Sequence, residues 1–136
     1  RWIDLYEVRE GDVILTSKGS ALKIAIVHKE IKNAILSSNL FLIRLNQNKY
    51  KPEILKYYLE SKRGQELLST IMKGAVIKSI SNKDLEGLVI PNIKVEKQEI
   101  IKNKIMDAKR QYEEATLRAR EVYDNNMKNI ENMINF

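Results

Sequence analysis

The last third of the chain, from Asn92 to Phe136, contains neither glycine nor proline. Because these two residues commonly end or break helices, a long uninterrupted helix is expected from about Val95 onward. Glu96 and Glu99 lie in its first turns, where acidic side chains interact favourably with the helix dipole. A helix of about 40 residues is roughly 60 Å long, at a rise of 1.5 Å per residue. The preceding residues are too few to cover it, so we expect a partner helix to pack against it.

Apolar residues repeat along this segment as they do in a coiled coil. Two series with a spacing of seven residues interleave as the a and d positions of a heptad repeat. The expected helix-pairing residues are Ile101, Ile105, Ala108, Tyr112, Ala115, Ala119 and Val122. After Val122 the apolar positions step by one residue, as in a stutter, to Tyr123, Met127, Ile130 and Ile134. The alternative is a helix that folds back onto its own domain.

The first 92 residues are expected to form a mixed α/β (α+β) domain. Clusters of β-branched and other apolar residues predict strands at 12–15, 23–27, 40–45, 76–80 and 88–90. Apolar residues at helical spacing predict a helix that starts at Pro52 and is interrupted at Gly64, and a second helix that ends at Gly74. Ser81 followed by Asp84 predicts one more helical turn. We therefore divide the chain into a domain of residues 1–92 and a helix of residues 93–136.

The net charge of +6 is concentrated in one part of the chain. Val13–Lys83 contains 13 Lys or Arg and 4 Asp or Glu, a net charge of +9, whereas residues 93–136 contribute only +1. A concentrated positive field favours a polyanionic partner. The alternative at this stage is a lysine-rich surface that has no such partner.

The sequence offers no set of residues from which an active site can be assembled. It has no cysteine and one histidine, His28, which excludes thiolate chemistry and most histidine-based metal sites and triads. Neither of the glycine-rich motifs that bind phosphate groups, GxxxxGK(S/T) and GxGxxG, occurs in the sequence. We therefore expect no catalytic residue, no metal and no cofactor.

No apolar run approaches the ~20 residues of a membrane span and no signal peptide is visible, so we expect a cytoplasmic protein without a membrane partner.

Three loops of the basic region carry side chains suited to DNA. Lysine and arginine contact phosphates, whereas amides and hydroxyls contact base edges. The candidate DNA-binding residues are Lys18, Ser20 and Lys23 in the first loop, Asn46, Gln47, Asn48 and Lys49 in the second, and Lys73, Lys78 and Ser79 in the third. Each residue taken alone is explained more simply as a solvated side chain, but the set agrees with the uneven charge.

Five segments follow one another in an order known from one protein family. They are GDVILTSKGSALKIAIV (Gly11–Val27), Ser38–Leu45, Ile54–Gly64, Gly74–Leu85 and Ile90–Ile101. In this order they resemble the motifs of type I restriction-modification specificity subunits. The resemblance covers the chain from about Trp2 to Ile105. The last segment is similar to the family's I-P-x-P…Q-x-x-I, which opens a long helix.

The sequence departs from the family pattern at three places. Leu22 stands at the second glycine of the first motif, and Ile93 stands at the second proline of the last motif. Trp2-Ile3 resembles the middle of a recognition domain, and the chain begins at Arg1 rather than at a methionine. The resemblance therefore implies the C-terminal part of a DNA target-recognition domain, followed by its spacer helix.

The resemblance implies a function in defence without catalysis by this chain. Such subunits carry two recognition domains, separated by long helices that pair as an antiparallel coiled coil, and each domain reads half of a split DNA sequence. The implied partners are double-stranded DNA, an adenine-methyltransferase (modification) subunit and a motor-nuclease subunit. The C-terminal helix is expected to pair within a longer chain, with a methyltransferase subunit or with a second copy in a homodimer.

Two other functions are also compatible with the sequence. The first is the recognition domain of a fused type II methyltransferase-endonuclease, which would carry an adenine-methylating motif upstream. The second is a structural coiled-coil module whose basic domain binds another protein. Salt dependence separates this second function from DNA recognition, because only DNA binding weakens steeply as salt rises.

Overall fold

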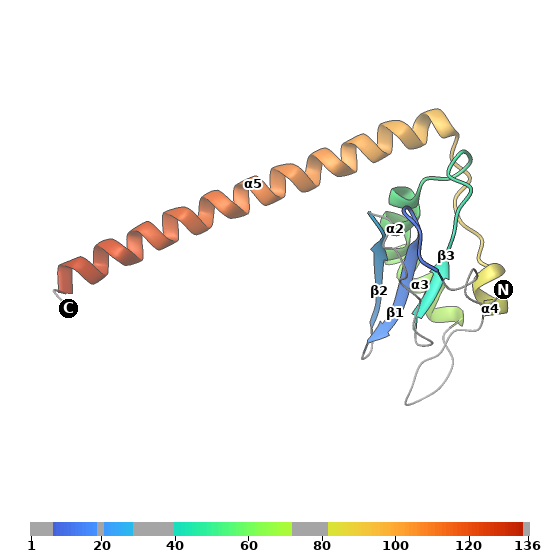
Figure 1. Cartoon of the computed structure of the whole chain (residues 1–136), viewed down its shortest axis with the longest axis horizontal. Helices are drawn as coiled ribbons and strands as arrows, with labels where there is room; N and C mark the ends of the chain where they lie inside the picture. The colour runs from blue at the N-terminus through green and yellow to red at the C-terminus, as the bar shows by residue number, and fades with distance from the viewer. Residues whose placement is uncertain (1–6, 19–20, 29–39, 72–81, 135–136) are drawn as a thin grey trace. The chain divides into compact units, whose positions relative to one another are not determined.

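The computed structural model describes residues 7–18, 21–28, 40–71 and 82–134. The chain divides into two compact units, Arg1–Glu99 and Ile100–Phe136. Within the described ranges, the first unit contains a three-stranded antiparallel sheet and three short helices, and a long helix runs through the second unit (Figure 1). The expected mixed α/β fold followed by a long C-terminal helix is therefore confirmed.

The sheet has the strand order β2-β1-β3, so the first strand lies in its centre (Figure 1). The strands are β1 (Val13–Lys18), β2 (Ala21–Ile26) and β3 (Leu40–Ile43). Successive side chains of a strand point to opposite faces of the sheet. Val13, Leu15 and Ile24 are buried, whereas Lys23 is exposed. One face of the sheet therefore carries the core, and Lys23 points to the other face.

Two helices complete the core of the first unit. The helices described before the long helix are α2 (Pro52–Glu60), α3 (Lys62–Ile71) and α4 (Asn82–Glu86). The buried cluster consists of Val13, Leu15, Ile24, Leu55, Leu59 and Leu68, from β1, β2, α2 and α3. The predicted start at Pro52 is confirmed, because a proline at the first position of a helix lacks only an N–H that the helix would leave unpaired.

The break between α2 and α3 lies at Ser61, so the predicted interruption at Gly64 is wrong. Ser61 has an extended backbone, and its hydroxyl oxygen accepts a hydrogen bond from the N–H of Gly64 at 3.2 Å. This is the geometry of a serine at a helix N-cap, which pairs an N–H of the first turn. Gly64 itself is a buried helical residue of α3.

Residues 88–90 do not form the predicted strand. The N–H of Leu88 donates to the carbonyl of Leu85 at 3.2 Å, which ends α4 in a turn. Leu88 and Ile90 pack against the buried cluster without forming regular secondary structure. The apolar run thus contributes to the core without pairing in the sheet. The strand predicted at 76–80, the helix end at Gly74 and the cap at Ser81 lie outside the described residues.

The long helix α5 comprises Val95–Ile134, as the sequence predicts, and is uninterrupted (Figure 1). From Ile100 onward it belongs to the second unit. Charged residues recur along its whole length. None of the helices in the described part of the chain is both long and apolar enough to cross a membrane.

Candidate nucleic-acid interface

The second candidate DNA-binding loop, Asn46–Lys49, is a tight polar turn between β3 and α2. The N–H groups of Lys49 and Tyr50 donate to the carbonyl of Asn46, at 2.9 and 3.0 Å. The N–H of Asn48 donates to the side-chain oxygen of Asn46 at 3.1 Å. Such asparagine turns satisfy the backbone locally. The turn therefore holds four exposed candidate side chains on a short, hydrogen-bonded backbone.

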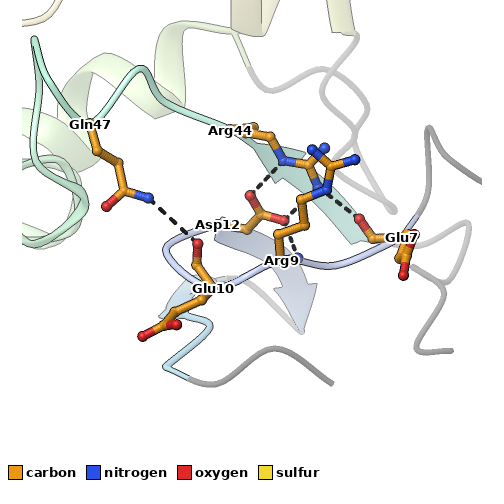
Figure 2. Close-up of polar contacts among 6 residues, drawn as sticks. All are labelled: Glu7, Arg9, Glu10, Asp12, Arg44 and Gln47. Atoms are coloured by element: carbon orange, nitrogen blue, oxygen red, sulfur yellow. Dashed lines mark hydrogen bonds and ion pairs between the residues drawn. The ribbon is translucent and has the colours of Figure 1, made fainter. Parts of the chain in front are cut away.

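The side chain of Gln47 lies against the turn that precedes β1. Its amide donates a long hydrogen bond of 3.5 Å to the carbonyl of Glu10 (Figure 2). Gly11 has a φ of +87°, which favours glycine, and a Cβ there would lie only 2.1 Å from the Gln47 amide nitrogen. Gly11 thus leaves room for this amide, and one of the four candidate side chains also joins two turns of the unit.

An ion pair between Asp12 and Arg44 fixes the same two turns at their bases (Figure 2). Nε and Nη2 of Arg44 donate to the two carboxylate oxygens of Asp12, at 2.9 and 2.8 Å. Nη2 of Arg44 also donates to the carbonyl of Glu7, and the N–H of Arg9 donates to Asp12. The hydrogen bond to Asp12 raises the pKa of the Arg44 guanidinium. Asp12 is 1% exposed, so its buried carboxylate depends on these hydrogen-bond donors for stabilisation.

The other end of the Asn46–Lys49 turn is tied to the start of α5 by Gln98, which is fully buried. Its side-chain oxygen accepts from the N–H of Lys51 at 2.8 Å. Its side-chain nitrogen donates to the carbonyls of Lys49 and Ile93, at 3.0 and 2.8 Å. One amide side chain thus pairs three backbone groups from two segments.

Two further contacts join the same segments. The hydroxyl of Tyr50 donates to the carbonyl of Pro91 at 3.1 Å. Burial raises the pKa of the Tyr50 phenol above its ordinary value. The ammonium of Lys51 lies 2.8 Å from a carboxylate oxygen of Glu99. Together with Gln98, these contacts preorganise the backbone from Lys49 to the first helical residues of α2.

Replacing Gln98 with leucine is expected to lower the free energy of unfolding by about 2–3 kcal/mol, because it leaves part-buried backbone groups without partners. Urea denaturation measures this loss, and the amide of Lys51 should exchange faster with solvent. Asn103→Leu, at an exposed position of the same helix, is the control and should change stability by at most about 0.5 kcal/mol. Equal losses in the two variants would contradict the role given to Gln98.

The structure separates the candidate residues that it describes. Lys23 pairs in register with Thr16, towards the hairpin end of β1, whereas the Asn46–Lys49 turn follows the opposite end of the sheet, where Ile43 pairs with Val13. Lys18 ends β1, and nothing of its side chain is described. Ser20, Lys73, Lys78 and Ser79 lie outside the described residues. Lys23 and the Asn46–Lys49 turn are therefore not parts of one small site.

The seven residues predicted for helix pairing all lie on α5. Tyr112 and Val122 are 73% and 59% exposed, and the three alanines are exposed as well. Ile101 and Ile105 are half-buried.

His28 is exposed and lies two residues after the end of β2. Over the described ranges, no group of three or more His, Cys, Asp or Glu side chains is placed to hold a metal ion.

Sequence reasoning named neither Asp12, Arg44 nor Gln98 as a site residue. All three lie within the quoted motif segments, and each makes a part-buried polar contact. The chain matches no protein-family model. It matches no curated protein either.

Proposed function

We propose that this chain is a DNA-recognition module that directs a separate adenine methyltransferase to its target. The observation that carries the proposal is the Asn46–Lys49 turn, in which amide side chains and a lysine lie exposed on a preorganised backbone. Amides can donate to and accept from base edges in the major groove, and lysine neutralises phosphate. A preorganised turn loses little conformational entropy on binding.

The charge around the turn supports a polyanionic ligand. Lys49 makes no ion pair with any described residue, whereas Lys51 and Lys56 are paired with Glu99 and Glu60. Its charge therefore remains available to a phosphate. Glu10 lies beside Gln47 and opposes such a ligand (Figure 2). The net charge of +9 over Val13–Lys83 outweighs this local negative charge.

The resemblance to type I specificity subunits adds the context of the proposal. In this context the chain supplies recognition, a modification subunit supplies methyl transfer, and a motor-nuclease subunit supplies cleavage. α5 serves as the spacer that a partner helix covers. In this context we expect the chain to act in the cytoplasm.

Lys49→Glu is expected to weaken binding to duplex DNA and to make the plot of log affinity against log salt less steep by about 1, the value for one lost phosphate contact. Fluorescence anisotropy with a labelled duplex of mixed sequence, titrated at several salt concentrations, measures both quantities. Glu10→Gln should have the opposite effect on affinity, because it removes a negative charge beside the turn.

Lys128→Glu, in the second unit, is the matched control, since it changes the net charge by the same amount. It should leave the salt slope unchanged if the Asn46–Lys49 turn is the contact. An affinity that does not change with salt in the unmodified chain would refute DNA binding and favour a protein-binding module. Equal effects of Lys49→Glu and Lys128→Glu would show that the turn is not the site.

A further inference from the structure

The side-chain amide of Gln47 is held in one orientation by the turn that precedes β1. Its nitrogen donates to the carbonyl of Glu10, and Figure 2 shows its oxygen on the side away from that carbonyl. The reverse orientation would place the amide oxygen against the carbonyl oxygen, and both of these atoms can only accept hydrogen bonds. The Glu10 carbonyl therefore determines which end of the amide faces away from the turn.

Gly11 provides the space in which this amide lies. A Cβ at Gly11 would lie 2.1 Å from the amide nitrogen of Gln47, 2.9 Å from its Cδ and 3.1 Å from its Oε1, so the whole amide packs against the glycine backbone. The N–H of Asp12 donates to the carbonyl of Arg9 at 3.0 Å, and Gly11 has a φ of +87°, which fits a type II turn with glycine at its third position. The carbonyl of the second residue, Glu10, accepts no hydrogen bond within such a turn and is available to Gln47.

Both ends of this contact are fixed before any ligand binds. On one side, the N–H of Gly11 donates to the carbonyl of Val27 at 2.7 Å, and the ion pair between Asp12 and Arg44 holds the same turn. On the other side, Gln47 belongs to the hydrogen-bonded Asn46–Lys49 turn. An exposed glutamine that is already oriented loses less conformational entropy on binding than a freely rotating one.

The neighbouring amides of the turn are held differently. The side-chain oxygen of Asn46 accepts from the N–H of Asn48, so this acceptor already has a partner within the turn. The side chain of Asn48 makes no hydrogen bond with any described residue, so neither of its ends is selected. Among these three amides, Gln47 alone combines a fixed orientation with an acceptor that faces away from its partner.

We propose that Gln47 recognises an adenine in the major groove of duplex DNA, an inference that rests on the proposed function and names the base that the turn selects. One N–H of the amide is used by the Glu10 carbonyl. The other N–H and the oxygen remain, as a donor beside an acceptor. The adenine edge is complementary, with its N7 acceptor beside its N6 amino group. The Gln47 oxygen accepts from N6, and the remaining N–H donates to N7.

The fixed orientation disfavours the other three bases. Guanine presents two acceptors, N7 and O6, so the Gln47 oxygen would face another acceptor. A free amide would avoid this by turning over, but here that would bring its oxygen against the Glu10 carbonyl. Cytosine presents an amino group without a neighbouring acceptor, and thymine presents an acceptor without a donor. Each therefore leaves one group of Gln47 unpaired, which costs binding free energy.

Selection from a pool of DNA duplexes with a randomised central segment measures the base preference of the full chain at each position. We expect at least one position to prefer adenine over guanine by about 5- to 150-fold, the discrimination of one bidentate contact. Gln47→Met keeps the length of the side chain and removes its polar groups. It should lower the preference at that position to less than about twofold and leave the other positions unchanged.

Two further changes test the chemistry of the contact. Gln47→Glu places a carboxylate, which only accepts, so the preference at the same position should change from adenine to cytosine, whose N4 amino group donates. Replacing the selected adenine with 7-deazaadenine removes the N7 acceptor. It should weaken binding of the unmodified chain by about fivefold and leave binding of Gln47→Met unchanged.

Gln111→Met is the matched control, because it makes the same substitution at an exposed position of α5, and it should leave every base preference unchanged. Lys49→Glu should instead weaken binding to all sequences alike, as the loss of a phosphate contact does. An adenine preference that survives Gln47→Met, or a pool in which no position prefers adenine, would overturn the inference. If binding is still sensitive to salt, the proposed function stands in both cases. An unmodified chain without salt-sensitive binding would overturn the proposed function, and the recognition of adenine with it.

Discussion

Arg44→Met is expected to lower the free energy of unfolding by about 3–5 kcal/mol, because it leaves a buried carboxylate without its cation. Asp12 is 1% exposed and accepts three hydrogen bonds from described residues, two from the Arg44 guanidinium and one from the N–H of Arg9. The variant removes both guanidinium bonds, and the bond to the Glu7 carbonyl as well. Urea denaturation followed by circular dichroism measures the loss.

Lys56→Met is the matched control for this loss. Lys56 and Glu60 form an exposed pair one helical turn apart, and such pairs contribute only about 0.3–0.5 kcal/mol. Arg44→Lys should fall between the two variants, because an ammonium cannot donate to both carboxylate oxygens in the planar geometry of a guanidinium. If Arg44→Met were no more costly than Lys56→Met, the ion pair would not hold the two turns together.

The ion pair also links stability to the proposed function. It fixes the turn before β1 against the strand that leads into the Asn46–Lys49 turn. We expect Arg44→Met to weaken DNA binding through disorder of the turn, yet to leave the salt slope per bound molecule unchanged. A positioning residue and a phosphate contact thus differ in a measurable way, since only the phosphate contact contributes to the slope.

The elements that could be predicted from sequence are those defined by local patterns. The absence of glycine and proline after Asn92 predicted α5, and Pro52 predicted the start of α2. The prediction failed where two local signals competed. Gly64 predicts a helix break, but Ser61, three residues earlier, caps α3 with its hydroxyl and ends the preceding helix.

Contacts between distant segments could not be predicted in this way. Asp12 and Arg44 are 32 residues apart, and Gln98 is 49 residues from Lys49. In neither pair does the local sequence around one residue indicate which residue it contacts. Only the strand order β2-β1-β3 brings the end of β3 beside the start of β1, and this order depends on tertiary packing.

The candidate site was predicted in composition but not in arrangement. The signal at Asn46, Gln47 and Asn48 correctly predicted a turn, although β3 ends at Ile43, two residues before the predicted strand end. The sequence could not indicate that Gln47 also contacts the Glu10 carbonyl, or that Lys23 lies towards the other end of the sheet. Of the ten candidates, the Asn46–Lys49 turn is therefore the part on which the described structure allows a DNA contact to be designed and tested.

Gly64→Ala is expected to lower the free energy of unfolding by about 3 kcal/mol or more, through overpacking against backbone that cannot move freely. A Cβ at this position would lie 1.9 Å from the carbonyl oxygen of Tyr58 and 2.6 Å from the Cα of Leu59. Both atoms belong to the last turns of α2, so the two helices would have to separate. Leu59 and Leu68, one from each helix, are fully buried and would lose their packing.

The direction of the change in the free energy of unfolding tests the close approach of α2 and α3. In an ordinary helix interior, replacing glycine with alanine raises stability by up to about 1 kcal/mol, because alanine restricts the unfolded chain. Gly87→Ala is the control, since the nearest atoms to its Cβ would lie 3.6 Å away, and it should change stability by no more than about 0.5 kcal/mol. A stabilising Gly64→Ala would mean that the close approach of α2 and α3 is not present in solution. A strongly destabilising one, beside a neutral Gly87→Ala, would assign the glycine to this helix contact, where its missing side chain lets Leu59 and Leu68 meet.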